Sequence, residues 1–178
     1  MVRSTLFSCL LLSLATFTAQ AGDKTLYLHY SAEGPGGCTL TINRIDDGGT
    51  DEGSGCSEDN KSLCESDPKA NACVCGKKDN KVKWKVSKES VIPDGVNFTV
   101  TFTAPKDARG QAFSPFKNEN QCGATIIFGK EGQNCALGDF ALFDSLAFEY
   151  EVIAANGIEP GQPDAIHCVA DPRIVIEH

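Results

Sequence analysis

Apolar and polar residues alternate along several stretches of the chain. The alternation is most regular over residues 96–103, where valine or phenylalanine at one position is followed by asparagine or threonine at the next. Residues 81–86 follow the same pattern, so that Val82, Trp84 and Val86 share one side and three lysines share the other. A period of two residues is typical of a strand with one buried face. Both stretches are therefore predicted to be strands whose apolar side chains point into a core.

Residues 26–30, 39–43 and 146–152 repeat the alternation, and residues 124–128 are a short apolar run bounded by glycines. Two further candidate strands, at residues 166–169 and 173–176, close the chain. Glycine, proline, asparagine and aspartate separate them, as expected of turns. No segment has a sustained helical period, although residues 139–148 could hold a short helical turn. The sequence thus predicts an all-β fold: an antiparallel β-sandwich of seven or eight strands with Greek-key connections.

Residues 46–80 interrupt this pattern. They are rich in glycine, serine, aspartate, asparagine and cysteine, and eight acidic residues but one lysine lie between Asp46 and Asp67. A loop of this length is unusual in a compact domain unless it is functional or cross-linked. We expect it to contact a partner, and its clustered carboxylates could also bind calcium. The alternative is a solvated loop that the lysines at 77–88 neutralise. The expected binding residues are Asp46, Asp47, Asp51, Glu52, Glu58 and Asp59.

The first 21 residues have the features of a cleavable signal peptide. Arg3 precedes an apolar run over residues 6–17, and an Ala-Gln-Ala sequence ending at Ala21 is a typical cleavage site. The run is shorter than the roughly 20 residues of a membrane span. We therefore expect a secreted or periplasmic protein without a membrane span, whose residues 22–178 form a single β-sandwich domain.

The charge of the mature chain narrows the choice of partners. Arg3 is the only charged residue of the predicted signal peptide, so residues 22–178 keep all 24 acidic residues and 15 of the 16 basic ones, a net charge of −9. This excess of negative charge disfavours nucleic acid and anionic membrane surfaces. The expected partner is an extracellular protein or a glycan.

Eight cysteines remain once Cys9 leaves with the signal peptide. An even number in an exported chain indicates disulfides. Cys73 and Cys75 are too close in the sequence to pair comfortably with each other, so each is expected to have a different partner, while the remaining connectivity stays open. A soft metal ion bound by this C-x-C pair with Cys56 and Cys64 is the alternative. The expected disulfide cysteines are Cys38, Cys56, Cys64, Cys73, Cys75, Cys122, Cys135 and Cys168.

The residues of a catalytic site are not evident. The chain has three histidines, His29, His167 and His178, and it lacks the G-x-S-x-G nucleophile elbow of serine hydrolases. No catalytic residue is therefore identified. Asn60 and Asn97 each begin an N-glycosylation sequon, which would be used only in a eukaryotic secretory pathway.

The second half of the chain resembles the cupredoxin-like β-sandwich of small secreted bacterial proteins, over residues 80–178. The resemblance implies the same sandwich fold. A blue-copper site would need two histidines and a cysteine, usually with a methionine. Here no histidine closely follows Cys168 and the only methionine is Met1, so copper is not expected. No cofactor is expected apart from the possible calcium ion in the acidic loop. The features that carry the resemblance are the strand at 81–86 with the single Trp84, the strand at 96–103, the Pro115-Phe116 turn, residues 149–152 and the ending Asp171-Pro172-Arg173-Ile174-Val175-Ile176.

These features favour a secreted or periplasmic binding module without catalytic activity. It would contact its partner through the acidic cysteine-rich loop. One alternative is a metal-handling or redox protein on a cupredoxin-like scaffold. A second is a small secreted hydrolase that uses acidic residues.

Overall fold

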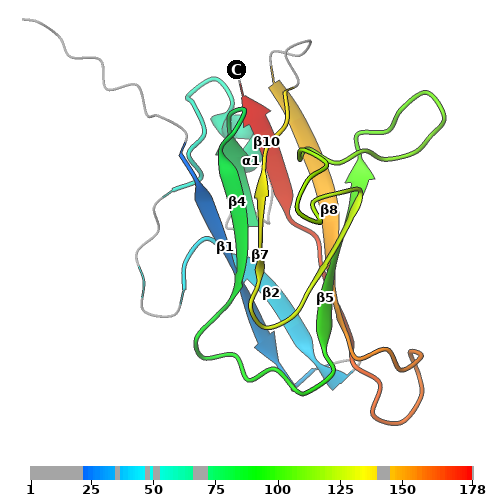
Figure 1. The fold of residues 1–178 in the computed structure, drawn as a ribbon. Helices are drawn as coiled ribbons and strands as arrows, with labels where there is room; N and C mark the ends of the chain where they lie inside the picture. Colours follow the sequence, from blue (N-terminus) through cyan, green and yellow to red (C-terminus); the bar gives the residue numbers. More distant parts are fainter. Residues whose placement is uncertain are drawn as a thin grey trace, which may run out of the picture.

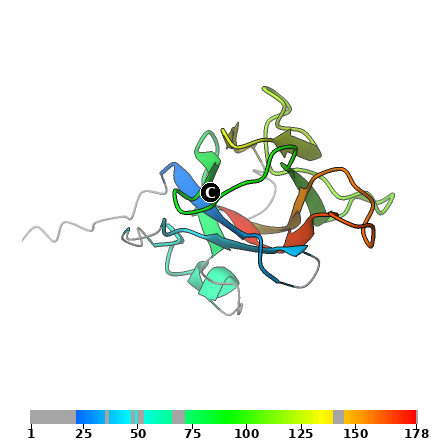
Figure 2. The same ribbon diagram turned by 90° about the horizontal axis from the view of Figure 1, so that it is seen from below.

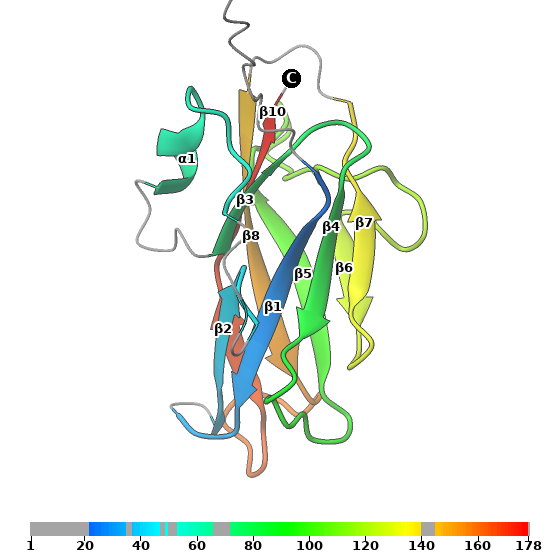
Figure 3. The same ribbon diagram turned by 90° about the vertical axis from the view of Figure 1, so that its left-hand side faces the viewer.

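The computed structural model describes residues 22–34, 37–46, 49, 53–65, 72–139 and 145–177, and the predicted signal peptide lies outside them. Within these residues the chain forms ten strands and one short helix, α1 (Lys61–Glu65). The strands form two sheets that pack as two layers (Figure 1, and seen from below in Figure 2). Figure 3 looks onto the four-stranded layer, with the other sheet behind it. No helix in the described residues has the length and apolar character needed to span a membrane.

A four-stranded sheet makes one layer, in the order β2-β1-β4-β7, from β1 (Lys24–Ser31), β2 (Thr39–Asn43), β4 (Lys81–Val86) and β7 (Gln133–Ala136). The other layer is a six-stranded sheet made of β3 (Cys73–Gly76), β10 (Arg173–Glu177), β8 (Ser145–Ala155), β5 (Asn97–Ala104), β6 (Thr125–Phe128) and β9 (His167–Ala170). In this sheet β9 and β10 pair with different parts of the same long strand, β8.

An aromatic cluster around Trp84 joins the two layers. Trp84 is fully buried, its ring stacks against Phe128 at a centroid distance of 6.2 Å, and it meets Tyr150 edge-on at 6.1 Å. Its indole nitrogen also lies 3.4 Å from the Tyr150 hydroxyl, to which it donates a hydrogen bond. Burial raises the pKa of Tyr150, which keeps this hydroxyl neutral. One apolar core thus receives side chains from both sheets.

Each of the predicted strands is present, and the alternation identified the buried faces. In β5 the inward residues Phe98, Val100 and Phe102 are all buried, and in β4 Val82 and Trp84 are buried while Val86 packs half-buried against the core. On β9, His167 is exposed and Cys168 is buried, as expected of neighbours on one strand. The period-two pattern is therefore confirmed as a guide to the core.

The prediction of purely antiparallel sheets is wrong for two of the strand pairs. β1 pairs in parallel with β4, with Leu26 opposite Trp84, and β3 pairs in parallel with β10, with Cys73 opposite Arg173. A parallel pair requires a long crossover connection. The chain between β2 and β4 provides one, because it crosses to the far side of β1 and contributes β3 to the other sheet on the way. The residues expected to form a loop thus make the sheets mixed.

Sequence reasoning also missed β3 and β7. Both are four residues long, and their sequences, CVCG and QNCA, contain few of the branched and aromatic residues that are typical of strands. Cys73 and Cys75 in β3 and Cys135 in β7 are buried through disulfides rather than through an apolar pattern. The short helical turn considered for residues 139–148 is wrong where the structure describes that range, because β8 begins at Ser145.

All eight cysteines after the predicted signal peptide are paired. Cys38–Cys168 connects the start of β2 to β9, and therefore cross-links the two sheets. Cys122–Cys135 fastens the loop before β6 onto β7. The other two pairs are Cys56–Cys75 and Cys64–Cys73, which confirms that Cys73 and Cys75 have different partners.

Candidate functional site: the cystine-stapled segment

Residues 53–65 and 72–76, called the cystine-stapled segment below, form a small layer on the outer face of the six-stranded sheet. Figure 3 shows α1 standing outside β3, at the side of the sandwich. Side chains of β3 alternate, so Val74 enters the main core while Cys73 and Cys75 point toward the segment. The acidic loop expected from the sequence is therefore partly regular structure, with one strand and one helix.

This layer has a core of its own that consists largely of sulfur. Cys64, Cys73 and Cys75 are fully buried together with Val175 of β10, and Leu63 and Ala147 pack half-buried against them. The Cα atoms are 4.8 Å apart in Cys56–Cys75 and 5.4 Å apart in Cys64–Cys73. Because these few side chains bury little apolar area, the two disulfides are the main source of rigidity here.

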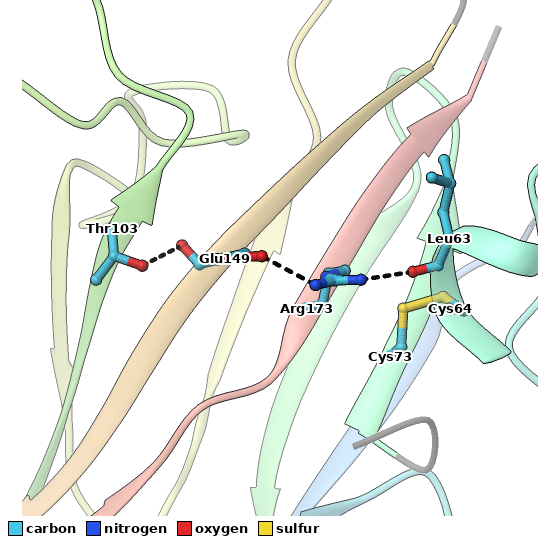
Figure 4. A network of polar contacts seen from close by, with 6 residues as sticks. All are labelled: Leu63, Cys64, Cys73, Thr103, Glu149 and Arg173. Atoms are coloured by element: carbon cyan, nitrogen blue, oxygen red, sulfur yellow. Dashed lines mark hydrogen bonds and ion pairs between the residues drawn. A yellow bond between two sulfur atoms is a disulfide. The ribbon is translucent and has the colours of Figure 1, made fainter. Parts of the chain in front are cut away.

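Arg173 attaches α1 to the sheet. One guanidinium nitrogen donates to the Leu63 carbonyl at 2.8 Å, and the other donates to a Glu149 carboxylate oxygen at 2.9 Å (Figure 4). Thr103 in turn donates to the Glu149 backbone carbonyl at 3.2 Å. The Arg173 side chain is 22% exposed, so this charge pair is shielded from solvent on the arginine side. The row of contacts therefore crosses β5, β8 and β10 and ends on the helix.

Glu177 holds the other end of the segment. It is 3% exposed, and its carboxylate accepts hydrogen bonds of 2.9 Å from both the backbone nitrogen and the hydroxyl of Ser57. The Cys75 nitrogen donates to the Ser54 carbonyl at 2.8 Å, and Arg44 donates to the Cys73 carbonyl at 3.0 Å. Together these bonds fix the segment to the sheet on both sides of the disulfides.

Glu177→Ala is expected to lower the free energy of unfolding by about 2 kcal/mol, because two hydrogen bonds to a buried carboxylate are lost and the Ser57 donors are left without their acceptor. Urea denaturation followed by circular dichroism measures the change. Glu151→Ala, on the neighbouring strand, is the control, and we expect it to change the stability by less than about 0.5 kcal/mol. An equal loss in both variants would show that the Ser57–Glu177 contact contributes nothing specific.

The predicted binding residues fall into two places. Glu58 and Asp59 are exposed in the turn before α1. Asp46 is only 14% exposed, and its carboxylate accepts hydrogen bonds from the Ser87 hydroxyl at 2.8 Å and the Lys88 nitrogen at 3.4 Å. Asp46 is therefore engaged at the end of β4. The other predicted residues, Asp47, Asp51 and Glu52, lie outside the described residues.

Among the described residues, the only potential metal ligands that lie close together in a group of three or more are cysteine sulfur atoms. The one group of potential ligands that converges there is Cys56, Cys64 and Cys75, whose sulfur atoms lie within 4.8 Å of one another and take part in the two disulfides. The acidic residues of the described part form no comparable group. Calcium binding at residues 46–52 stays a prediction, because most of that range lies outside the described residues.

The two sequons are placed differently. Asn97 is exposed at the start of β5, whereas Asn60 is half-buried and its amide donates to the Ser57 hydroxyl at 3.2 Å. Asn60 immediately precedes α1 inside the cystine-stapled segment, and the Leu63 nitrogen donates to its backbone carbonyl at 3.0 Å. Asn97 is therefore the more accessible of the two asparagines.

A polar pocket of about 280 Å³ lies next to Arg173, the residue that contacts Leu63 of the segment. Thr103, Glu149 and Arg173, which belong to the row of contacts described above, line it together with Glu151 and Asp171. Sequence reasoning did not identify Arg173 or Glu177 as anchors. A signal was present, since both are charged residues at the two ends of the otherwise apolar last strand.

Comparison with models of known protein families gives no match, and comparison with curated proteins gives none either. The function must therefore be inferred from the site itself.

Proposed function

We propose that this protein is an exported binding module without catalytic activity, and that its cystine-stapled segment contacts a partner protein through Glu58 and Asp59. The observation that carries the proposal is the way the segment is held. Two disulfides, Arg173 and Glu177 fix a short stretch of chain that presents exposed carboxylates at two adjacent positions.

Rigidity of this kind suits recognition. A loop that is already ordered loses less conformational entropy when it binds, so more of the contact energy appears as affinity. Exposed carboxylates on a rigid turn select a partner surface of positive charge and speed up encounter with it. A basic protein surface is thus the complement to Glu58 and Asp59, and a glycan is the competing possibility.

Export is part of the same proposal. The predicted signal peptide supports it, and so do the four disulfides, because disulfides persist mainly in oxidising compartments. The cupredoxin-like, Greek-key character of the sandwich, suggested by the resemblance of residues 80–178, belongs to the proposal as well. The two packed sheets support it only at the level of an all-β sandwich.

Reversal of the two charges tests the proposed surface. The partner is first identified by chemical cross-linking of the mature chain to exported proteins of its own source, and its dissociation constant is then measured by surface plasmon resonance. Glu58→Lys with Asp59→Lys is expected to weaken binding at least about tenfold, because favourable contacts become like-charge contacts. Added salt should weaken the binding of the parent protein.

A matched control is available in Glu119→Lys with Glu159→Lys. These two residues are also exposed and give the same change in net charge, but they lie in other loops. We expect binding within about twofold of the parent protein. If both double variants lose affinity equally, net charge rather than this surface governs binding. Cross-linking to a glycan instead of a protein would contradict the proposed partner class.

A further inference from the structure

The two disulfides of the cystine-stapled segment are in direct contact with each other. The sulfur atoms of Cys56 and Cys64 are 3.2 Å apart, and those of Cys64 and Cys75 are 3.8 Å apart, although neither pair is bonded. A movement of roughly 1 Å would bring Cys56 and Cys64 to the length of a disulfide bond. The arrangement is that of a thiol next to the disulfide it can attack, as soon as either cystine opens.

The four cysteines of the two touching disulfides differ in their exposure to solvent. Cys56 is half-buried and lies at the surface end of the pair, whereas Cys64, Cys73 and Cys75 are fully buried. A thiol from solution can therefore reach Cys56 more easily than the other three sulfurs. Reaction at a disulfide depends on such access.

Two arginines donate to backbone carbonyls beside the Cys64–Cys73 disulfide. Arg44 donates to the Cys73 carbonyl at 3.0 Å, and Arg173 is paired with Cys73 across β10 and β3 and donates to the carbonyl next to Cys64. The whole chain contains only four arginines and has a net charge of −8. Neighbouring positive charge stabilises a thiolate and makes it a better leaving group. Glu149 offsets part of the Arg173 charge, and the positive charge that remains beside the Cys73 backbone favours Cys73 as the sulfur that is released.

We propose that the cystine-stapled segment is a thiol–disulfide exchange site that accepts two electrons from an external dithiol and releases Cys73 and Cys75 as free thiols. In the first step a thiolate of the dithiol attacks Cys56 and the Cys56–Cys75 bond breaks, leaving Cys75 as a thiolate that takes up a proton. The second thiol of the dithiol then closes its own disulfide and frees Cys56. In the last step the Cys56 thiolate attacks Cys64, a Cys56–Cys64 bond forms, and Cys73 leaves.

The product places two thiols on the same face of β3. Cys73 and Cys75 are two residues apart on one strand, so both side chains point to the side where the segment lies. The external dithiol has been oxidised to its disulfide, and the protein has exchanged two local disulfides for one plus a C-x-C dithiol. This inference does not depend on which partner binds Glu58 and Asp59.

Partial reduction of the mature protein tests the exchange. The protein is treated with a limiting amount of dithiothreitol, quenched in acid, alkylated with N-ethylmaleimide in urea at mildly acidic pH, and mapped by peptide mass spectrometry. The expected two-thiol species carries label on Cys73 and Cys75 and contains the Cys56–Cys64 bond. A two-thiol species labelled on Cys56 and Cys75, with Cys64–Cys73 intact, would overturn the proposal, as would prior opening of Cys38–Cys168 or Cys122–Cys135.

A variant isolates the last step. In Cys75→Ser, Cys56 is left as a single thiol beside the Cys64–Cys73 disulfide, so label should be shared between Cys56 and Cys73. The matched control is Cys122→Ser, in which Cys135 should take all the label because no second disulfide contacts that pair in the described residues. Label on Cys56 alone would show that the contact supports no exchange.

The role of charge can be separated from that of structure. Arg44→Gln in the Cys75→Ser background should slow the appearance of label on Cys73, and Arg44→Lys, which keeps the charge, should restore most of the rate. The rate at which iodoacetamide alkylates Cys56 should stay the same in both. Equal rates for glutamine and lysine would remove the charge of Arg44 from the mechanism.

Discussion

Replacing Cys38 and Cys168 together with alanine is expected to lower the free energy of unfolding by about 5 kcal/mol. A disulfide stabilises a protein largely by restricting its unfolded chain, and the restriction grows with the length of the loop that it closes. This pair has a sequence separation of 130 residues, the longest of the four. It also joins β9 to the start of β2, so its loss allows the two sheets to separate at that edge.

The control for this expected loss of stability is the double replacement of Cys64 and Cys73 with alanine. That pair is also buried but has a sequence separation of only 9 residues, so the same reasoning gives a loss of about 2.5 kcal/mol. Guanidinium denaturation of both variants measures the difference. Similar losses would mean that native packing, rather than the closed loop, determines what each disulfide contributes.

Most of the fold was predictable because a sandwich gives most of its strands one buried face and one exposed face. The alternation in residues 96–103 and 81–86 reports that face directly, and the structure buries Phe98, Val100 and Trp84 accordingly. A local pattern of this kind contains no information about the direction of a strand's neighbours. The parallel pairs β1–β4 and β3–β10 depend on where the long connection after β2 leads the chain, and no local rule specifies this.

Prediction of the candidate site was less complete for a related reason. The cysteines and acidic residues that mark the site lie close together in the sequence, and the composition of that stretch revealed the segment. Its anchors are not consecutive: Leu63 and Arg173 are 110 residues apart, and Ser57 and Glu177 are 120 residues apart. A single sequence shows no link between such distant positions, so the role of the last strand became visible only in three dimensions.

The segment can stay attached to the sheet while its disulfides exchange, because its anchoring contacts lie on a distant part of the chain. Its hydrogen bonds to Arg173 and Glu177 connect it to β10 and do not pass through the sulfur atoms. Exchange between the two cystines can therefore alter the connectivity inside the segment while these bonds keep it on the sheet. Binding through Glu58 and Asp59 and exchange at Cys56 would then be separable by mutation, since neither carboxylate takes part in the proposed electron transfer.

Trp84→Ala is expected to lower the free energy of unfolding by about 4 kcal/mol, which is typical of removing a large aromatic side chain from a close-packed core. Trp84 is fully buried at the centre of the contact between the layers, where its ring meets Phe128 and Tyr150. The variant also leaves the buried Tyr150 hydroxyl without the hydrogen bond that the indole donates. Trp84 is the only tryptophan, so unfolding has to be followed by far-ultraviolet circular dichroism rather than by tryptophan fluorescence.

Lys85→Ala is the control for Trp84→Ala, because Lys85 is the next residue of β4 and is exposed on the opposite face. We expect its stability to lie within about 0.5 kcal/mol of the parent protein. Trp84→Phe should fall between the two, since it keeps an aromatic ring in the core but loses the donor to Tyr150. If Trp84→Ala were no less stable than Lys85→Ala, the two sheets would not share the core that their packing indicates.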